Sequence, residues 1–267
     1  MKRIAFAVKM YGLLLRTGAR SMAQYRADFW IGFAGVVLLN AANLVQLGVV
    51  SWRFQSVDGW SAAELMVLYG MCMVSWSLYS IFFKNLNNLE SEILSGAFDR
   101  YLLRPVSPFL QLVGGDVRYT GLCDTLLGLA LVICGCAGEG ARWGVGQCLW
   151  FVLLVLCGGA IMVCIQTMIS CAAFWIAKSS ALRSITTHVY MLVQRYPISI
   201  FGAPLRVLVT AILPVAFLNY YPASFLLGKA TEPPWLAAAS PLVAVVFALL
   251  ARLMWKKGLR RYNGAGG

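Results

Sequence analysis

The chain has 267 residues, of which 60% are hydrophobic and 12% are charged, and its net charge is +12. Because ordinary soluble domains carry about 25% charged residues, a soluble globule of this composition would expose large apolar patches. The composition therefore excludes a water-soluble globular domain and indicates a protein that lies largely in lipid. The basic excess is typical of cytoplasmic loops in membrane proteins, and without a nucleic-acid-binding motif it gives no reason to expect nucleic acid as a partner.

Residues 1–28 are predicted to form an amphipathic helix on the cytoplasmic surface of the membrane. At 100° per residue, Lys2, Lys9, Arg16 and Arg20 fall on one side of this helix, and apolar residues occupy the other. Such a helix binds anionic lipid; the alternative is that its exposed face docks a cytoplasmic partner. Lys9 interrupts the apolar run, so a cleavable signal peptide is not predicted.

Six stretches within residues 29–255 are long and apolar enough to cross a hydrocarbon core, which takes about 20 helical residues. The fourth contains no charged residue and predicts one long, tilted helix. The fifth contains three prolines, which predict kinks. The six predicted spans are 29–50, 61–83, 111–137, 143–177, 186–218 and 235–255.

The distribution of basic residues predicts that both termini are cytoplasmic. Most Lys and Arg residues fall before the first span, in the loops after the second and fourth spans, and around the basic tail 256–267. The loops on the opposite side hold only Arg53, Arg142 and Lys229. Cytoplasmic loops collect basic residues, so an even number of spans leaves both ends of the chain inside.

The sequence offers little material for catalysis. It contains no phosphate-binding P-loop and no hydrolase elbow, and its single His excludes a site built on paired histidines. We therefore expect no catalytic residue, no metal site and no cofactor bound by this chain. An intramembrane enzyme that uses Asp116 and Asp124 with His188 is the weaker alternative.

Several polar side chains lie at membrane depth, where they are costly unless they face protein or water. Two interpretations stay open: interhelical hydrogen bonds with an intramembrane ion pair between an aspartate and an arginine, or the polar lining of a translocation path. The candidates are Asn40, Asn43 and Gln46, which share one side of the first span, together with Asp116, Arg118, Asp124 and Arg195.

The cytoplasmic loop 84–108 carries the most informative pattern. Gly96 can end one helix, and Asp99 can cap a second, short one. The apolar residues that follow Asp99 predict an exposed apolar surface that fits a groove in a soluble partner. This surface, called the knuckle below, consists of Tyr101, Leu102 and Leu103. Two prolines, Pro105 and Pro108, end this element before the third span.

This loop resembles that of permease subunits of bacterial ABC exporters of the second type, especially their small six-span, viologen-exporter-like branch. The resemblance is carried by the order Gly, Asp, Leu-Leu-Arg-Pro within residues 93–105, and it covers nearly the whole chain. Later segments that agree are 196–201, 212–223 and 255–262. Ser95 departs from the family pattern, in which a basic residue is frequent, and so removes one possible ATPase contact.

The resemblance implies an all-α integral membrane protein of the bacterial cytoplasmic (inner) membrane, with six transmembrane helices and a re-entrant or outer segment at about 219–235. It implies a separate ABC ATPase subunit that binds ATP and Mg, and a second permease copy or a related permease. The cytoplasmic coupling helix would comprise Asp99, Arg100, Tyr101, Leu102, Leu103, Arg104 and Pro105.

An exporter of this kind would move a small amphipathic or cationic compound, such as a drug, toxin, lipid or peptide. Two alternatives remain open at this point. One is a proton-coupled secondary carrier that uses Asp116 or Asp124 as a proton relay. The other is a membrane scaffold that transports nothing.

Overall fold

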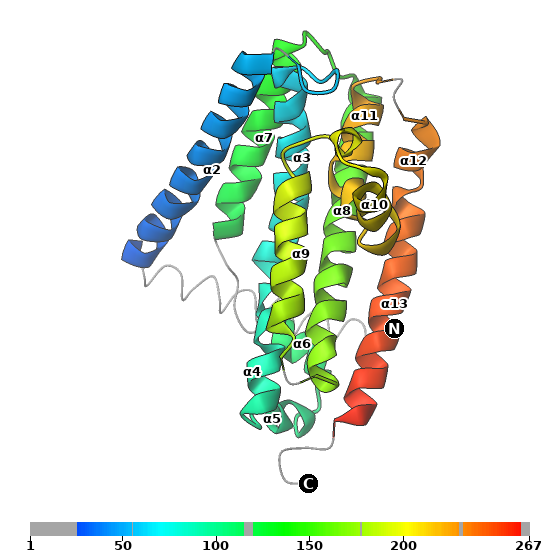
Figure 1. The fold of residues 1–267 in the computed structure, drawn as a ribbon. Coiled ribbons are helices and arrows are strands. Elements are labelled where there is room, and N and C mark those ends of the chain that lie inside the picture. Colours follow the sequence, from blue (N-terminus) through cyan, green and yellow to red (C-terminus); the bar gives the residue numbers. More distant parts are fainter. Residues whose placement is uncertain (1–25, 55, 115–119, 177, 230–231, 263–267) are drawn as a thin grey trace.

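The computed structural model describes residues 26–54, 56–114, 120–176, 178–229 and 232–262, and it shows an elongated bundle of helices (Figure 1). The predicted interfacial helix at 1–28 lies almost entirely outside the described residues. Within them the chain forms helices and turns, with one isolated bridge between Val57 and Trp60.

Four long helices build the core. The central one is α3 (Ala62–Phe82), which packs against α7 (Thr120–Gly138) and α8 (Val145–Cys171), and α8 in turn packs against α13 (Ser240–Arg261). The outer helix α2 (Arg26–Phe54) leans on α7 and α3 (Figure 1). A capping box between Ser61 and Glu64 defines the start of α3.

Helices α3 and α7 approach each other closely because glycines line their contact. A methyl group placed on Gly128 would lie 2.9 Å from the backbone oxygen of Gly70 and 2.8 Å from Cγ2 of Val74. Small residues at helix interfaces allow this backbone proximity inside a membrane. The contact fixes the position of α7, which carries Asp124.

Among the described residues, three helices are long and apolar enough to cross a membrane: α3, α7 from Gly121, and α8 continued by η2 (Ala172–Phe174). The fourth predicted span thus forms one continuous helix of 27 residues before η2. The stretch Trp30–Gln46 of α2 is apolar but shorter. Helix α13 has 22 residues and runs past the predicted boundary at residue 255, so much of the basic tail is helical.

The fifth predicted span, 186–218, is wrong as a single kinked helix. Helix α9 (Ser180–Val193) ends before Pro197, and the chain continues in short turns. Proline lacks an amide hydrogen and restricts the residue before it, so three prolines in this stretch prevent a continuous helix. The short elements are η3 (Ile198–Ile200), α10 (Ala203–Val207), the π-turn η4 (Leu208–Ile212) and η5 (Val215–Leu218).

The start of the third predicted span, 111–137, includes the end of a separate helix. Residues 108–113 form this short helix, α6 (Pro108–Val113), which ends at Gly114. The described part of α7 begins at Thr120, and the predicted candidates Asp116 and Arg118 lie outside the described residues.

The two ends of the bundle differ. One end holds η1 (Lys84–Asn88), α4 (Leu89–Leu94), α5 (Asp99–Leu102) and α6, beside the last turns of α13 (Figure 1). The opposite end holds α11 (Tyr220–Leu226) and α12 (Pro234–Ala238). Helix α11 falls within the segment 219–235 that sequence analysis separated from the spans, whereas α12 continues into the sixth predicted span.

Candidate translocation cavity and coupling surface

A cavity of about 420 Å³ lies where α2, α3, α7 and α9 meet. Its lining includes four of the predicted polar candidates, contributed by α2, α7 and the turn after α9: Asn40, Asn43, Asp124 and Arg195. Arg195 lies two residues beyond Val193, the last residue of α9. The structure therefore brings together residues that are up to 155 positions apart in the sequence.

A chain of hydrogen bonds crosses the cavity wall. Asn43 Nδ2 donates to the Tyr69 hydroxyl at 3.1 Å, and that hydroxyl donates to Asn40 Oδ1 at 2.7 Å. Asn40 Nδ2 donates to Asp124 Oδ1 at 3.4 Å. The network links α2, α3 and α7, and it gives the buried side of the Asp124 carboxylate a neutral donor.

The sequence left open which aspartate would pair with which arginine, and among the described residues Asp124 and Arg195 form no ion pair. Arg195 Nη1 donates instead to Gln46 Oε1 at 2.7 Å, on the exposed side of α2. Among the described residues the ion pairs are Glu90 with Arg183 and Glu64 with Lys229. The two charges in the cavity thus face neutral amides, and the Nε atom of Arg195 is buried without a hydrogen-bond partner.

An aromatic pair forms another part of the cavity wall. The rings of Trp76 and Tyr190 stack with centroids 4.3 Å apart and an angle of 26° between their planes. Sequence analysis did not select these residues or Tyr69. A signal was present, because Trp76 follows Tyr69 by seven positions and the two share one face of α3. The cavity therefore combines one carboxylate, one guanidinium, the three amides of Asn40, Asn43 and Gln194, and stacked rings.

Residues 84–108, called the coupling loop after the role that sequence analysis predicts for them, form the surface at one end of the bundle (Figure 1). Helix α4 ends before Gly96, whose φ of 71° reverses the chain, and α5 follows. Phe98, and not Asp99, occupies the N-cap position of α5, so the predicted capping role of Asp99 is wrong. Leu103 is 86% exposed and Leu102 is 45% exposed, while Phe98 is completely buried.

Phe98 fixes the coupling loop to the rest of the molecule. Its ring meets the rings of Phe174 and Tyr262 edge to face, at centroid distances of 5.7 and 5.0 Å. Phe174 also contacts Trp255 at 5.8 Å. This small core joins α5 to the ends of α8 and α13, and burial beside Asp99 raises the pKa of Tyr262 to about 12.

A polar clasp joins the coupling loop to the start of α9. Glu90 Oε2 accepts a hydrogen bond from Ser179 at 2.8 Å and lies 3.4 Å from Arg183 Nη2. Arg183 Nη1 also donates to the backbone oxygen of Asn87 at 2.8 Å. Sequence analysis missed this clasp, because its two charges are 93 positions apart.

The clasp is charged at neutral pH. Burial raises the pKa of the Glu90 carboxyl, but the hydrogen bonds from Ser179 and Ser180 and the positive charge of Arg183 outweigh it, so the pKa lies below its ordinary value. The bonded carboxylate therefore stabilises the fold above the ordinary pKa of a Glu, and this contribution is lost as the pH falls through the lowered value.

The chain matches the sequence model of the ABC-2 family of transporter proteins over residues 37–266. The chain belongs to this family. Comparisons with curated proteins and with solved structures gave no match. As an ABC-2 family protein it is a membrane component of a transporter and not itself a catalytic subunit, and proteins of this family typically work with an ATPase subunit.

The ABC-2 match covers both features described above, the cavity from Leu39 onward and the whole coupling loop. In the described part of this ABC-2 protein, no group of three His, Cys, Asp or Glu side chains is placed to hold a metal ion. The polar cavity and the exposed knuckle are the two features of this chain that bear on transport.

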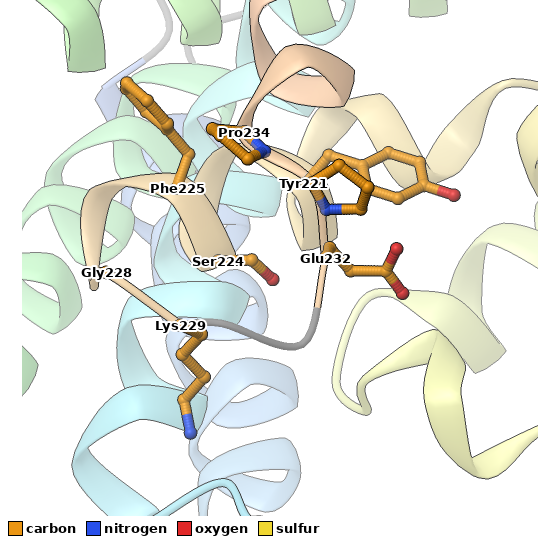
Figure 2. A pocket seen from close by; sticks show the side chains of 8 residues that line it. Tyr221, Ser224, Phe225, Gly228, Lys229, Glu232 and Pro234 are labelled. Carbon is orange, nitrogen blue, oxygen red and sulfur yellow. The ribbon is translucent and has the colours of Figure 1, made fainter.

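A second cavity, of about 690 Å³, opens at the opposite end of the bundle and is lined entirely by residues of the segment 219–235 (Figure 2). The buried Ser224 hydroxyl has no hydrogen-bond partner there. Lys229 is already engaged: its Nζ lies 2.6 Å from Glu64 Oε2 and 4.7 Å from the ring centre of Trp60. The Lys229 side chain therefore connects the segment 219–235 to the first turn of α3.

Proposed function

We propose that the chain is the membrane-spanning permease subunit of an ATP-dependent exporter in the bacterial cytoplasmic membrane, with both termini in the cytoplasm. Hydrolysis occurs on a separate ATPase subunit, which holds the ATP and Mg. A second permease, identical or related, completes the pump. The family membership supports a transporter component; the direction, the small six-span type and the partners belong to the proposal.

The observation that carries this proposal is the exposed apolar knuckle of the coupling loop. In the knuckle, Leu102 is 45% exposed and Leu103 is 86% exposed. Leu94, at the end of α4, is 62% exposed at the same end of the bundle, which also carries the basic last turns of α13. Three exposed leucines on a loop with a firmly packed base favour docking into a partner's groove. Arg100 and Arg104 beside them are also exposed and supply charged rim contacts.

The clasp gives a path from the knuckle to the cavity. Glu90 on α4 holds the first turn of α9 through Ser179, Ser180 and Arg183. The other end of α9 carries Tyr190, which lines the cavity. A displacement of the coupling loop would therefore shift α9 as a rigid helix and change the shape of the cavity.

The cavity fits a small amphipathic compound with an aromatic or cationic part. Asp124 offers a carboxylate to a cation, and the Trp76 and Tyr190 rings offer a surface for stacking. The guanidinium of Arg195, which also lines the cavity, offers a positive charge to an anionic or polar part of the same compound.

The position of Gln46 and Arg195 supports the proposal of a second permease. Gln46 is exposed on α2, and its amide holds the guanidinium of Arg195 at predicted membrane depth. Polar groups at that depth face protein or water and avoid lipid. A facing permease copy, with the translocation path between the two, provides such surroundings.

The test is copurification of the tagged chain from native membranes in mild detergent, followed by mass spectrometry and an ATPase assay. The proposal predicts a stoichiometric ATPase with a P-loop, and its loss in the Leu102→Asp/Leu103→Asp variant. The Arg261→Asp variant changes an exposed residue at the same end and serves as the matched control. Retention of the ATPase by the leucine variant would refute the proposed docking surface.

Asp124 sustains one alternative, a proton-coupled carrier, because its carboxylate lies in the cavity on a hydrogen-bonded network. The Asp124→Asn variant separates the two functions. A pump driven by ATP keeps transport within a few-fold of the wild type, since Asn still accepts the bond from Asn40. A proton carrier loses transport completely.

A further inference from the structure

A groove of about 470 Å³ lies between α8 and α13, at the end of the bundle that carries the coupling loop. It is separate from the polar cavity, with which it shares no lining residue. Cys164 and Thr167 of α8 form one wall, and Ala251 and Trp255 of α13 form the other. Phe109 of α6 closes the end through an edge-to-face contact with Trp255 at 5.1 Å.

Two basic side chains stand at this groove. Arg252 and Lys256 both line it and are exposed, and they lie four residues apart on one face of α13. No Asp or Glu lines the groove. Within the described part of the chain neither residue forms a hydrogen bond or an ion pair, so both charges are open to an anion.

The outer face of α13 next to the groove is apolar. Leu249 and Leu253 are each 54% exposed, and Leu250 is 46% exposed. In a membrane protein such a face meets acyl chains, and long basic side chains extend from it toward the headgroups. The Trp255 indole in the groove is a side chain typical of this interface.

We propose that this groove is a binding site for an anionic phospholipid. One acyl chain lies along the apolar walls between α8 and α13, and the phosphate of the headgroup receives hydrogen bonds from Arg252 and Lys256. Basic pockets between membrane helices recognise anionic headgroups in this way. The occupied groove would hold α13 on α8 beside the small core around Phe98 and Phe174 that supports the coupling loop.

Quenching of Trp255 fluorescence tests the site directly. The full chain is reconstituted in phosphatidylcholine vesicles that contain increasing amounts of phosphatidylglycerol with dibrominated acyl chains, or of phosphatidylcholine with the same chains. The Trp255→Phe variant, measured in parallel, isolates the signal of this ring from the other tryptophans. The proposal predicts that phosphatidylglycerol quenches Trp255 at a mole fraction about 25-fold lower, since each of the two basic residues contributes roughly a fivefold preference.

The charge variants give the second arm. Arg252→Gln/Lys256→Gln removes the preference for phosphatidylglycerol and leaves equal quenching by both lipids. Arg260→Gln/Arg261→Gln removes the same charge from the same helix outside the groove and keeps the preference. Equal quenching of the wild type by both lipids, or equal loss in both double variants, overturns the proposal.

Absence of quenching by either lipid also overturns it, because the groove would then be covered by protein. None of these readouts depends on ATP, an ATPase subunit or the orientation of the chain in the vesicle. Failure of the lipid site is therefore distinguishable from failure of the proposed exporter function.

Discussion

Asn219 shows how a single side chain replaces the helical hydrogen bonds that prolines remove. Its amide is completely buried, and Nδ2 donates to the backbone oxygens of Val193 at 3.0 Å and Gln194 at 3.4 Å. Its Oδ1 accepts from the backbone nitrogen of Tyr220 at 2.8 Å. One residue thus satisfies the last turn of α9 and the first turn of α11 together.

We predict that Asn219→Ala lowers the free energy of unfolding by about 1–3 kcal/mol, because it leaves buried backbone groups without partners. Thermal unfolding in detergent measures the loss. Asn88→Ala is the matched control, since Asn88 is exposed and makes no capping hydrogen bond, and its effect stays within about 0.5 kcal/mol. Similar melting temperatures for the two variants would contradict the proposed role of Asn219.

At the same scale, the spacing of Asn40, Asn43 and Gln46 predicted which polar residues share one side of α2, but not their partners. Asn40 and Asn43 both meet Tyr69, and Gln46 meets Arg195. An ion pair between an aspartate and an arginine belonged to one of the two interpretations that the sequence left open. In the structure Asp124 instead accepts a hydrogen bond from the Asn40 amide, and Arg195 donates to the Gln46 amide. Helix packing decides which of these groups meet, and the sequence alone does not predict that packing.

At the scale of elements, the contact between α3 and α7 depends on the missing side chain of Gly128. We predict that Gly128→Ala separates the two helices and lowers the melting temperature, because the new methyl group would lie within 3.0 Å of atoms of Gly70, Val74 and Met73. A cost of roughly 1–3 kcal/mol is expected for such overpacking.

Gly146→Ala is the control for this change. It places the same methyl group on α8, where no heavy atom lies within 4 Å. Alanine favours a helix over glycine by about 1 kcal/mol, so this variant should be as stable as the wild type or more stable. A melting temperature of Gly128→Ala at or above the wild-type value would refute the close packing of α3 and α7.

The clasp between α4 and α9 makes a functional prediction at this scale. Glu90→Ala and Arg183→Ala should each lower the amount of substrate moved per ATP hydrolysed while the ATPase stays bound. Because the two side chains interact directly, the double variant should move no less substrate per ATP than the more impaired of the two single variants. The double-mutant cycle should give a coupling free energy of about 1 kcal/mol between Glu90 and Arg183.

Lys178→Ala is the control for the clasp. Lys178 is exposed in the same connection between α8 and α9, and it forms no ion pair with another described residue. Transport per ATP should be unchanged in this variant. If the losses of transport per ATP in the Glu90 and Arg183 variants simply added up in the double variant, the contact between these two side chains would not be the link between the coupling loop and α9.

The sequence predicts some elements well and others poorly, for a physical reason. The apolar stretch 143–177, which contains no proline, forms one long helix over Val145–Cys171, because local hydrogen bonding and lipid favour it together. The stretch 186–218 is also largely apolar but contains Pro197, Pro204 and Pro214, and its path is decided by Asn219 and by packing on α8. The turn at Gly96 was predictable because only local geometry is involved.

At the scale of the whole molecule, the basic residues predict an orientation. The end with the coupling loop and the last turns of α13 should face the cytoplasm, and the end with α11 and α12 should face outward. In a variant without the exposed cysteines Cys134 and Cys148, a membrane-impermeant maleimide applied to intact cells should label Asp58→Cys and not Arg260→Cys.

Labelling after cell lysis is the control, since both positions are exposed and should then react. The reverse pattern in intact cells would place the coupling loop outside the cell. An ATPase in the cytoplasm would then be unable to reach the knuckle.

The central claim is that the knuckle on the coupling loop docks an ATPase, and crosslinking from Leu103 tests it most directly. A photoreactive amino acid replaces Leu103 in the full chain, cells are irradiated, and the crosslinked product is identified by mass spectrometry. Val145, 80% exposed at the opposite end of the bundle, is the matched position. The account predicts a product with a P-loop ATPase from position 103 and none from position 145; no ATPase product from position 103 would contradict it.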